Sequence, residues 1–211
     1  MWRTQLRLQA AIFLGALALG SEALAQDTTG FSPPLDISLG FRGVGEVWQD
    51  PAIATHYRSS RFSGGGFASV GLLPWVSGEI EVGYMRQAAN SGVSGVAPGA
   101  LEIVPITISA HARKVSANSE LYAGLGYSMA VFTETTSVGT VSGTKPGLEL
   151  RTGVRVHTNL VQPSMWSGSS GGIKRVDVEF MFARRQHQPF GLGTGFDFSA
   201  WRLGLGMVAR L

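Results

Sequence analysis

Apolar and polar residues alternate along most of the chain beyond residue 34. The pattern is clearest in the last stretch, where Arg202, Gly204, Gly206 and Arg210 lie between apolar residues at every second position: Trp201, Leu203, Leu205, Met207, Ala209 and Leu211. Successive side chains of a strand point to opposite faces, so this period of two predicts a strand with one apolar and one polar face. We expect this strand to close a barrel built from the strands before it.

Seven earlier stretches show the same alternation, which gives an even count of eight strands of about ten residues each. The predicted strands are residues 35–47, 66–73, 79–86, 101–113, 121–131, 148–156, 175–185 and 201–211. The second strand is ambiguous, and Ala68, Val70 and Leu72 are favoured as its apolar face. Long loops are expected after strands 1, 3, 5 and 7, and short turns after strands 2 and 4. The long connection 158–172 departs from this rule.

Composition helps to decide which face points outwards. Charged residues make up 15% of the chain, against about 25% in ordinary soluble domains, and there are 29 glycines. The polar faces combine glycine with a few Asp, Glu and Arg residues, which suits the narrow interior of an eight-stranded barrel. The sequence therefore predicts an all-β, closed antiparallel up-and-down transmembrane barrel with its apolar faces against lipid. A secreted, lipocalin-like barrel with the opposite orientation is the alternative.

The N-terminal residues have the features of a secretory signal. Arg3 and Arg7 precede an apolar run over residues 8–20, and Ala23-Leu24-Ala25 fits a cleavage site. We therefore expect a signal peptide at 1–25, a flexible lead-in at 26–34 and a barrel domain at 35–211. The chain has no cysteine and a formal charge of +3, which is too small to indicate binding to nucleic acid.

Charged residues on the polar faces are expected to pair inside the barrel, because a buried charge without a partner is costly. Glu81 is expected to pair with Arg113 or His111. The predicted ion-pair network comprises Glu79, Glu81, His111, Arg113, Glu149, Arg151, Arg155, Asp177, Glu179, Arg185, Arg202 and Arg210. Such a network would plug the lumen, whereas a narrow pore would use the same residues to line a water channel. Aromatic residues near strand ends predict membrane-interface girdles at Trp75, Tyr84, Phe182 and Trp201.

Two short motifs resemble the eight-stranded outer-membrane β-barrels of Gram-negative bacteria, of the OmpA, OmpX and opacity-protein type. They are Tyr122-Ala123-Gly124-Leu125-Gly126-Tyr127 and Leu203-Gly204-Leu205-Gly206. The resemblance implies an outer-membrane location and, as partners, outer-membrane lipid and lipopolysaccharide, the barrel-assembly machinery, and an extracellular ligand or host surface. It implies a structural or surface-interaction role through outer loops, although members of this fold have several functions.

Three enzyme or metal hypotheses are weaker. Ser109, His111 and a nearby Glu could form a hydrolase triad, but no Gly-x-Ser-x-Gly motif is present. Lipid A deacylases are similar barrels with a His-x-Ser-Asn motif, of which His157-Thr158-Asn159 lacks the serine. His56 and His187 are expected in solvated loops, without neighbours at metal-ligand spacing. The sequence therefore predicts no catalytic residues, no metal and no cofactor.

Overall fold

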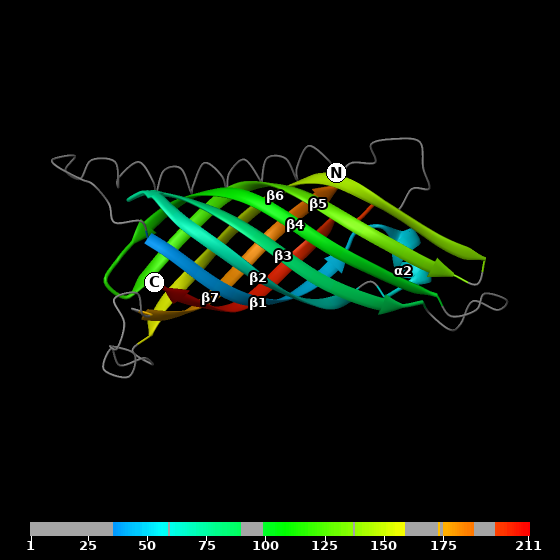
Figure 1. Ribbon diagram of the computed structural model, residues 1–211, viewed down its shortest axis with the longest axis horizontal. Helices are drawn as coiled ribbons and strands as arrows, with labels where there is room; N and C mark the ends of the chain where they lie inside the picture. Colours follow the sequence, from blue (N-terminus) through cyan, green and yellow to red (C-terminus); the bar gives the residue numbers. More distant parts are fainter. Residues whose placement is uncertain are drawn as a thin grey trace.

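The computed structural model is a closed barrel whose strands run obliquely around a long axis (Figure 1). It describes residues 36–58, 60–89, 99–136, 138–158, 173, 175–187 and 197–211, and the side chains of residues 52 and 54 are not described. The predicted signal peptide, the predicted lead-in and nearly all of the 158–172 connection lie outside these residues.

Eight strands and one short helix make up the described chain. Their bounds are β1 Asp36–Trp48, α2 Pro51–His56, β2 Ser60–Leu73, β3 Val76–Ala88, β4 Ala100–Val115, β5 Ser119–Thr136, β6 Gly139–Thr158, β7 Arg175–His187 and β8 Ala200–Arg210. Each strand pairs antiparallel with the next, and β1 pairs with β8, so the sheet has no open side. This is the predicted strand count and topology. No helix among the described residues is long and apolar enough to cross a bilayer.

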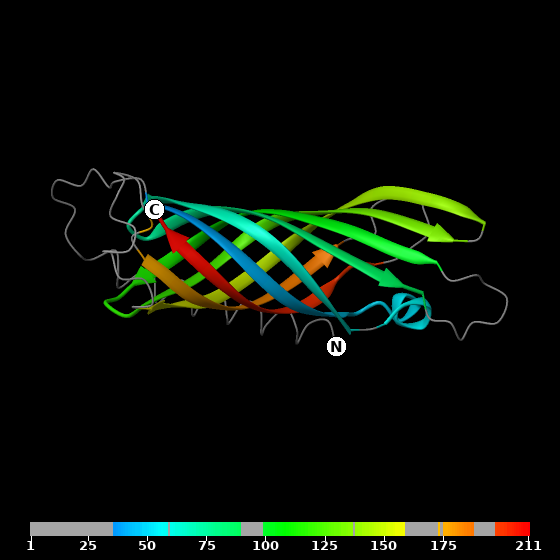
Figure 2. The same ribbon diagram turned by 60° about the horizontal axis from the view of Figure 1, so that its bottom comes forward.

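The two ends of the barrel differ. β1 begins and β8 ends at one end, which we call the terminal end, and α2 lies at the other, the α2 end (Figures 1 and 2). The described turns at the terminal end are short, as predicted: residues 74–75 join β2 to β3, and residues 116–118 join β4 to β5. The alternating connection lengths expected from the sequence therefore hold for these two turns.

The prediction of a long loop after the fifth strand is wrong. Residues 134–136 continue β5 and residues 139–146 belong to β6, and the two strands pair as a hairpin up to Thr136 and Gly139. Gly139, the first residue of β6, has a φ of 148° that favours glycine. The hairpin projects beyond the other described strands and α2 at this end (Figures 1 and 2). Threonine, serine and glycine suggested a loop, but threonine and valine also favour strands once a partner strand is present. Residues 60–65, also expected in a loop, begin β2.

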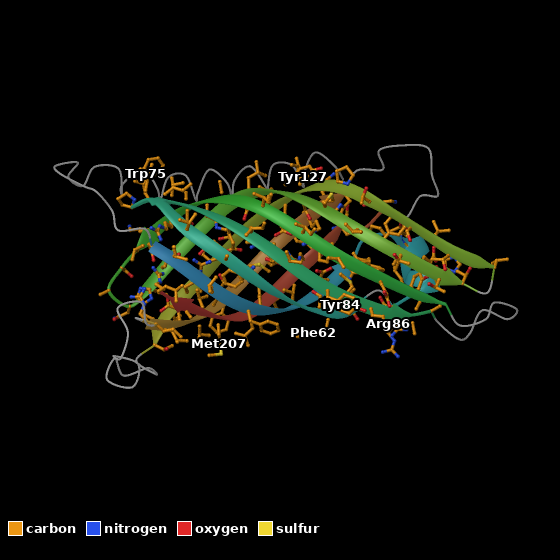
Figure 3. All side chains as sticks on the ribbon, viewed as in Figure 1. Phe62, Trp75, Tyr84, Arg86, Tyr127 and Met207 are labelled. Atoms are coloured by element: carbon orange, nitrogen blue, oxygen red, sulfur yellow. The ribbon has the colours of Figure 1, made fainter. Side chains whose placement is uncertain are left out.

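The apolar face of every strand points outwards. Leu205 and Leu125 are 57% and 46% exposed, whereas Arg155 and Glu179 on the opposite faces are 2% and 0% exposed. Ala68, Val70 and Leu72 lie on the outer side of β2 while Phe67 is buried, so the favoured face of this strand is also confirmed. Phe62, Tyr127 and Met207 extend away from the barrel (Figure 3).

These outward side chains form a continuous apolar belt. On β1 the belt reaches from Ile37 to Val47, ten residues apart. At ~3.4 Å per residue and a strand tilt of ~45°, the belt is about 24 Å tall, close to the ~25 Å apolar band of membrane barrels. Towards the α2 end, the outward face then becomes charged, at the Arg86–Glu102 ion pair of 3.3 Å.

The four aromatic residues predicted for the membrane interfaces all lie on the outside. Trp75 lies in a turn at the terminal end, whereas Tyr84 lies towards the α2 end, next to Arg86 (Figure 3). Phe182 and Trp201 come from the adjacent strands β7 and β8, and their rings stack with centroids 5.4 Å apart. The guanidinium of Arg184 lies 4.8 Å from the Trp201 ring.

Candidate functional site in the barrel lumen

Charged side chains from all eight strands meet inside the barrel. Apart from Asp36, which is 31% exposed, each side chain in this set is at most 10% exposed. The set contains eight arginines, Arg42, Arg61, Arg113, Arg151, Arg155, Arg185, Arg202 and Arg210, and eight carboxylates, Asp36, Glu46, Glu79, Glu81, Glu120, Glu149, Asp177 and Glu179. Opposite charges are therefore equal in number in this set, which we call the lumen network.

Glu79 is at the centre of the lumen network. Its carboxylate accepts hydrogen bonds from Arg42, Arg151 and Arg155, the last at 2.8 Å. Glu79 lies on β3, while Arg151 and Arg155 lie on β6, which is not adjacent to β3 in the barrel. These ion pairs therefore cross the lumen and connect opposite walls.

From this centre the lumen network continues towards the α2 end. Glu81 accepts hydrogen bonds from Arg42 and, at 2.7 Å, from Arg202. Arg202 also binds Glu149 at 2.8 Å and Glu46 at 3.0 Å. Because Arg202 contacts three carboxylates, it joins β8 to β1, β3 and β6 through side chains alone.

The lumen network also continues to the terminal end. Arg155 donates to Glu120 at 3.0 Å, and Glu120 accepts a 2.5 Å hydrogen bond from Arg210. Arg210 lies 3.2 Å from Asp36, which also pairs with Arg113 at 2.7 Å. An unbroken series of ion pairs therefore leads from the terminal end through Glu79 to Glu46 and Arg61.

An apolar cluster fills the lumen at the α2 end. Its buried members are Trp48, Ile53, Tyr57, Met85, Leu101, Ile103, Ala130, Phe198 and Ala200. The guanidinium of Arg61 lies 3.3 Å from the Trp48 ring centroid and joins this cluster to the lumen network. Helix α2 places Ile53 in the cluster, and Tyr57, which follows the helix, donates a 2.6 Å hydrogen bond to Glu134. Burial and this hydrogen bond raise the pKa of Tyr57 above its ordinary value.

Eleven of the twelve residues predicted for the network make ion pairs in the structure. The exception is His111, whose two ring nitrogens have no hydrogen-bond partner in the described structure and whose ring lies 5.1 Å from that of Tyr122. The predicted pairing of Glu81 with Arg113 or His111 is wrong, because Glu81 contacts Arg42, Arg151 and Arg202. Sequence parity placed these residues on the inner face but could not specify partners across the lumen.

The sequence prediction omitted several members of the lumen network: Asp36, Arg42, Glu46, Arg61 and Glu120. Arg42 and Glu46 share the inward parity of β1, and Glu120 shares that of Tyr122 on β5, so the alternation could have identified all three. Arg61 could not be found in this way, because residue 61 was expected in a loop. The apolar cluster was also missed, since inward apolar residues contradict a simple rule of polar inside and apolar outside.

The enzyme hypotheses receive no support from the geometry. The hydroxyl of Ser109 and both ring nitrogens of His111 lack hydrogen-bond partners in the described structure, so these residues do not form a triad. His157 points into the lumen, where its Nδ1 lies 3.2 Å from Asp177 Oδ1, and Asn159 lies outside the described residues. The expectation that His187 is solvated is wrong: it is 1% exposed, and its Nδ1 lies 3.0 Å from the Lys145 carbonyl oxygen. Within the described ranges, no group of three or more His, Asp or Glu residues could hold a metal ion.

Comparison with solved structures identifies the architecture. The chain superimposes on Ail, the attachment invasion locus protein of Yersinia pestis, with a TM-score of 0.51, 12% sequence identity, and coverage of 84% of this chain and 97% of Ail. Neisserial surface protein A gives a TM-score of 0.51 and 14% identity at the same coverages. The fold is that of the eight-stranded outer-membrane β-barrels. The sequence matches no protein-family model and no curated protein.

Proposed function

We propose that this barrel resides in the outer membrane of a Gram-negative bacterium, with its apolar belt in lipid and its α2 end facing outwards. The observation that carries the proposal is the reversed distribution of polarity, because charged residues are buried while large apolar side chains such as Phe62 and Leu203 are 74% and 69% exposed. A water-soluble lipocalin-like barrel would have the opposite arrangement. A closed sheet also leaves no strand edge unpaired in lipid.

The lumen is proposed to be a plug and not a pore. Its ion pairs cross between opposite walls, and the apolar cluster closes the α2 end above them. An eight-stranded barrel has an interior only wide enough for side chains to fill. The exposed ends are then the parts of the molecule available for interaction.

The proposed role is accordingly structural or interactive, exerted at the outer surface by the β5–β6 hairpin, α2 and the connecting segments. Ail was solved in complex with the heparin analogue sucrose octasulfate, so a barrel of this architecture can hold a ligand. For this chain, lipid, lipopolysaccharide and the barrel-assembly machinery are proposed as further partners. No enzymatic activity is assigned, because Ser109 and His111, the two residues of the predicted triad, make no side-chain hydrogen bond to each other in the described structure.

Membrane fractionation combined with gel mobility tests the location. The folded protein is expected in the outer-membrane fraction, resistant to alkaline carbonate, and to change its gel mobility after boiling. Recovery from detergent-free periplasm or culture medium would refute the membrane proposal.

A planar-bilayer recording tests the plug separately. Purified barrel is expected to give no steady ion conductance. A stable conductance that changes in Arg155→Ala or Arg202→Ala would show that the lumen conducts, while leaving the membrane location intact.

A further inference from the structure

A group of buried polar atoms on β3 and β4 has no hydrogen-bond partner among the described residues. The atoms are the hydroxyls of Ser77 and Ser109 and both ring nitrogens of His111. Their residues are only 2%, 7% and 1% exposed. Buried polar groups in folded proteins nearly always have a partner, whether protein or ordered water.

The strand register places these three residues together on the inner wall. Ser77 lies directly opposite His111, and Ser109 is two residues from His111 on the same face of β4. Cross-strand neighbours on one face have Cβ atoms about 4.5–5.5 Å apart. Two serines and one imidazole therefore present their polar atoms to the same part of the lumen.

The charged side chains of the lumen network near this group are hydrogen-bonded to one another and not to its atoms. Arg151 faces this group across Gly124, which pairs with both His111 and Arg151, but its three nitrogens all donate to Glu79 or Glu149. Arg155 likewise donates to Glu79, Glu120 and Glu179. Glu79, although opposite Ser109 in the register, leaves that hydroxyl without a bond.

The group leads towards the terminal end. Arg113 follows His111 on the inward face of β4, its side chain is 9% exposed, and its Nε also lacks a partner within the described residues. Towards the α2 end, the inward residue that follows Ser109 is Thr107, whose hydroxyl donates to Ser128 at 3.3 Å. The atoms without partners therefore form a line along β4 that begins at the terminal mouth and stops below Thr107.

We propose that Ser77, Ser109 and His111 bind a cluster of water molecules inside the barrel, near its terminal mouth. Each site has donors and acceptors that water can satisfy, and a buried water commonly makes about three hydrogen bonds. A bound anion fits less well, because Arg151 and Arg155 already donate to carboxylates with all of their guanidinium nitrogens. The lumen is thus wet on its terminal side and closed by apolar side chains on its α2 side.

Nuclear magnetic resonance of the unmodified barrel in lipid nanodiscs tests the proposal directly. Magnetisation transfer from water is expected at the Ser77 and Ser109 amides and at the His111 ring. It is not expected at Ser128, which is 0% exposed and whose hydroxyl accepts a hydrogen bond from Thr107. The proposal is overturned if the three residues receive no more magnetisation from water than Ser128 does. It is also overturned if the chemical shifts of the His111 ring change with the chloride concentration, since an anion would then occupy the site.

Single-cysteine variants test the entry of water, because the chain has no cysteine of its own. Silver ion, a thiol reagent of nearly the size of water, is added to folded Ser77→Cys, Ser109→Cys and the two controls Ser63→Cys and Ser128→Cys. The thiols at positions 77 and 109 are expected to react about tenfold faster or more than those of both controls, because a thiol in contact with water is reached more often than a protected one. Equal rates at all four positions would overturn the proposal. A variant that does not fold is recognised by its gel mobility, and the resonance experiment then decides.

Discussion

Removing the charge of Glu79 should destabilise the barrel more than any comparable change at its rim. Glu79→Gln keeps the size of the side chain but leaves Arg42, Arg151 and Arg155 with one carboxylate fewer among them. All four side chains are at most 2% exposed, so bulk solvent cannot readily screen the charges left without a partner. Breaking a buried ion pair from one side costs about 3–5 kcal/mol, and we expect a loss of this size in the free energy of unfolding.

The matched control is Asp36→Asn, which also removes one carboxylate from the lumen network. Asp36 is 31% exposed, so water can replace much of its interaction with Arg113 and Arg210. The expected loss is about 1 kcal/mol or less. The comparison therefore separates the effect of burial from the effect of charge number.

A double variant tests whether the effect is due to charge balance. Arg155→Met in the Glu79→Gln background restores equal numbers of opposite charges in the lumen network. We expect the double variant to be more stable than the sum of the single losses by about 1–3 kcal/mol. The measurement is reversible urea unfolding in phospholipid vesicles, followed by tryptophan fluorescence and gel mobility. A Glu79→Gln loss equal to that of Asp36→Asn would refute the reasoning.

Three further predictions concern other parts of the barrel. Leu205→Arg, at the middle of the apolar belt, should lower the unfolding free energy in vesicles by about 2–4 kcal/mol. The control Leu211→Arg, at the rim of the belt, should lower it by only about 0–1 kcal/mol. Equal losses in the two variants would contradict a lipid-facing Leu205. Gly124→Ala should cost about 1–3 kcal/mol, because a Cβ there would overlap the Ala110 carbonyl oxygen and the His111 ring. Gly45→Ala should be tolerated, since its Cβ would lie 3.8 Å from the Leu203 carbonyl oxygen. Tyr57→Phe should cost about 1 kcal/mol at neutral pH by removing the hydrogen bond to Glu134. The folded-state pKa of Tyr57 is raised above its unfolded value of about 10, so this stabilisation is present below pH ~10 and lost as pH rises through the folded-state pKa. Urea midpoints of wild type and Tyr57→Phe should therefore converge at alkaline pH, and a constant difference would argue against the assignment.

The local pattern was most informative where a strand has two unlike faces. The orientation of Leu125 and Leu205 on the outside, and of Arg155 and Glu179 on the inside, followed from alternation combined with the scarcity of charge. The pattern was least informative where both faces are polar or both are apolar. Residues 134–146 were therefore read as a loop, and the inward Leu101 and Ile103 of β4 gave no sign of the apolar cluster that they join.

No sequence pattern could predict which charged side chains pair with each other inside the lumen. Glu81 and Arg202 are 121 residues apart, yet their side chains form a 2.7 Å hydrogen bond across the barrel. The register of each strand pair and the closure of β1 on β8 fix such contacts, and neither is encoded in a single strand. The same applies to Glu79, which contacts arginines of β1 and β6 at once.

By itself, the sequence determined the strand count, the up-and-down order and the face of each strand that points out of the barrel, because side-chain alternation is a local property of extended chain. Only the tertiary structure decided which charges meet, where the apolar cluster closes the α2 end, and which polar atoms on β3 and β4 have no protein partner. The physical reason is that these contacts join residues from strands far apart in the chain. Their distances depend on how the whole sheet closes.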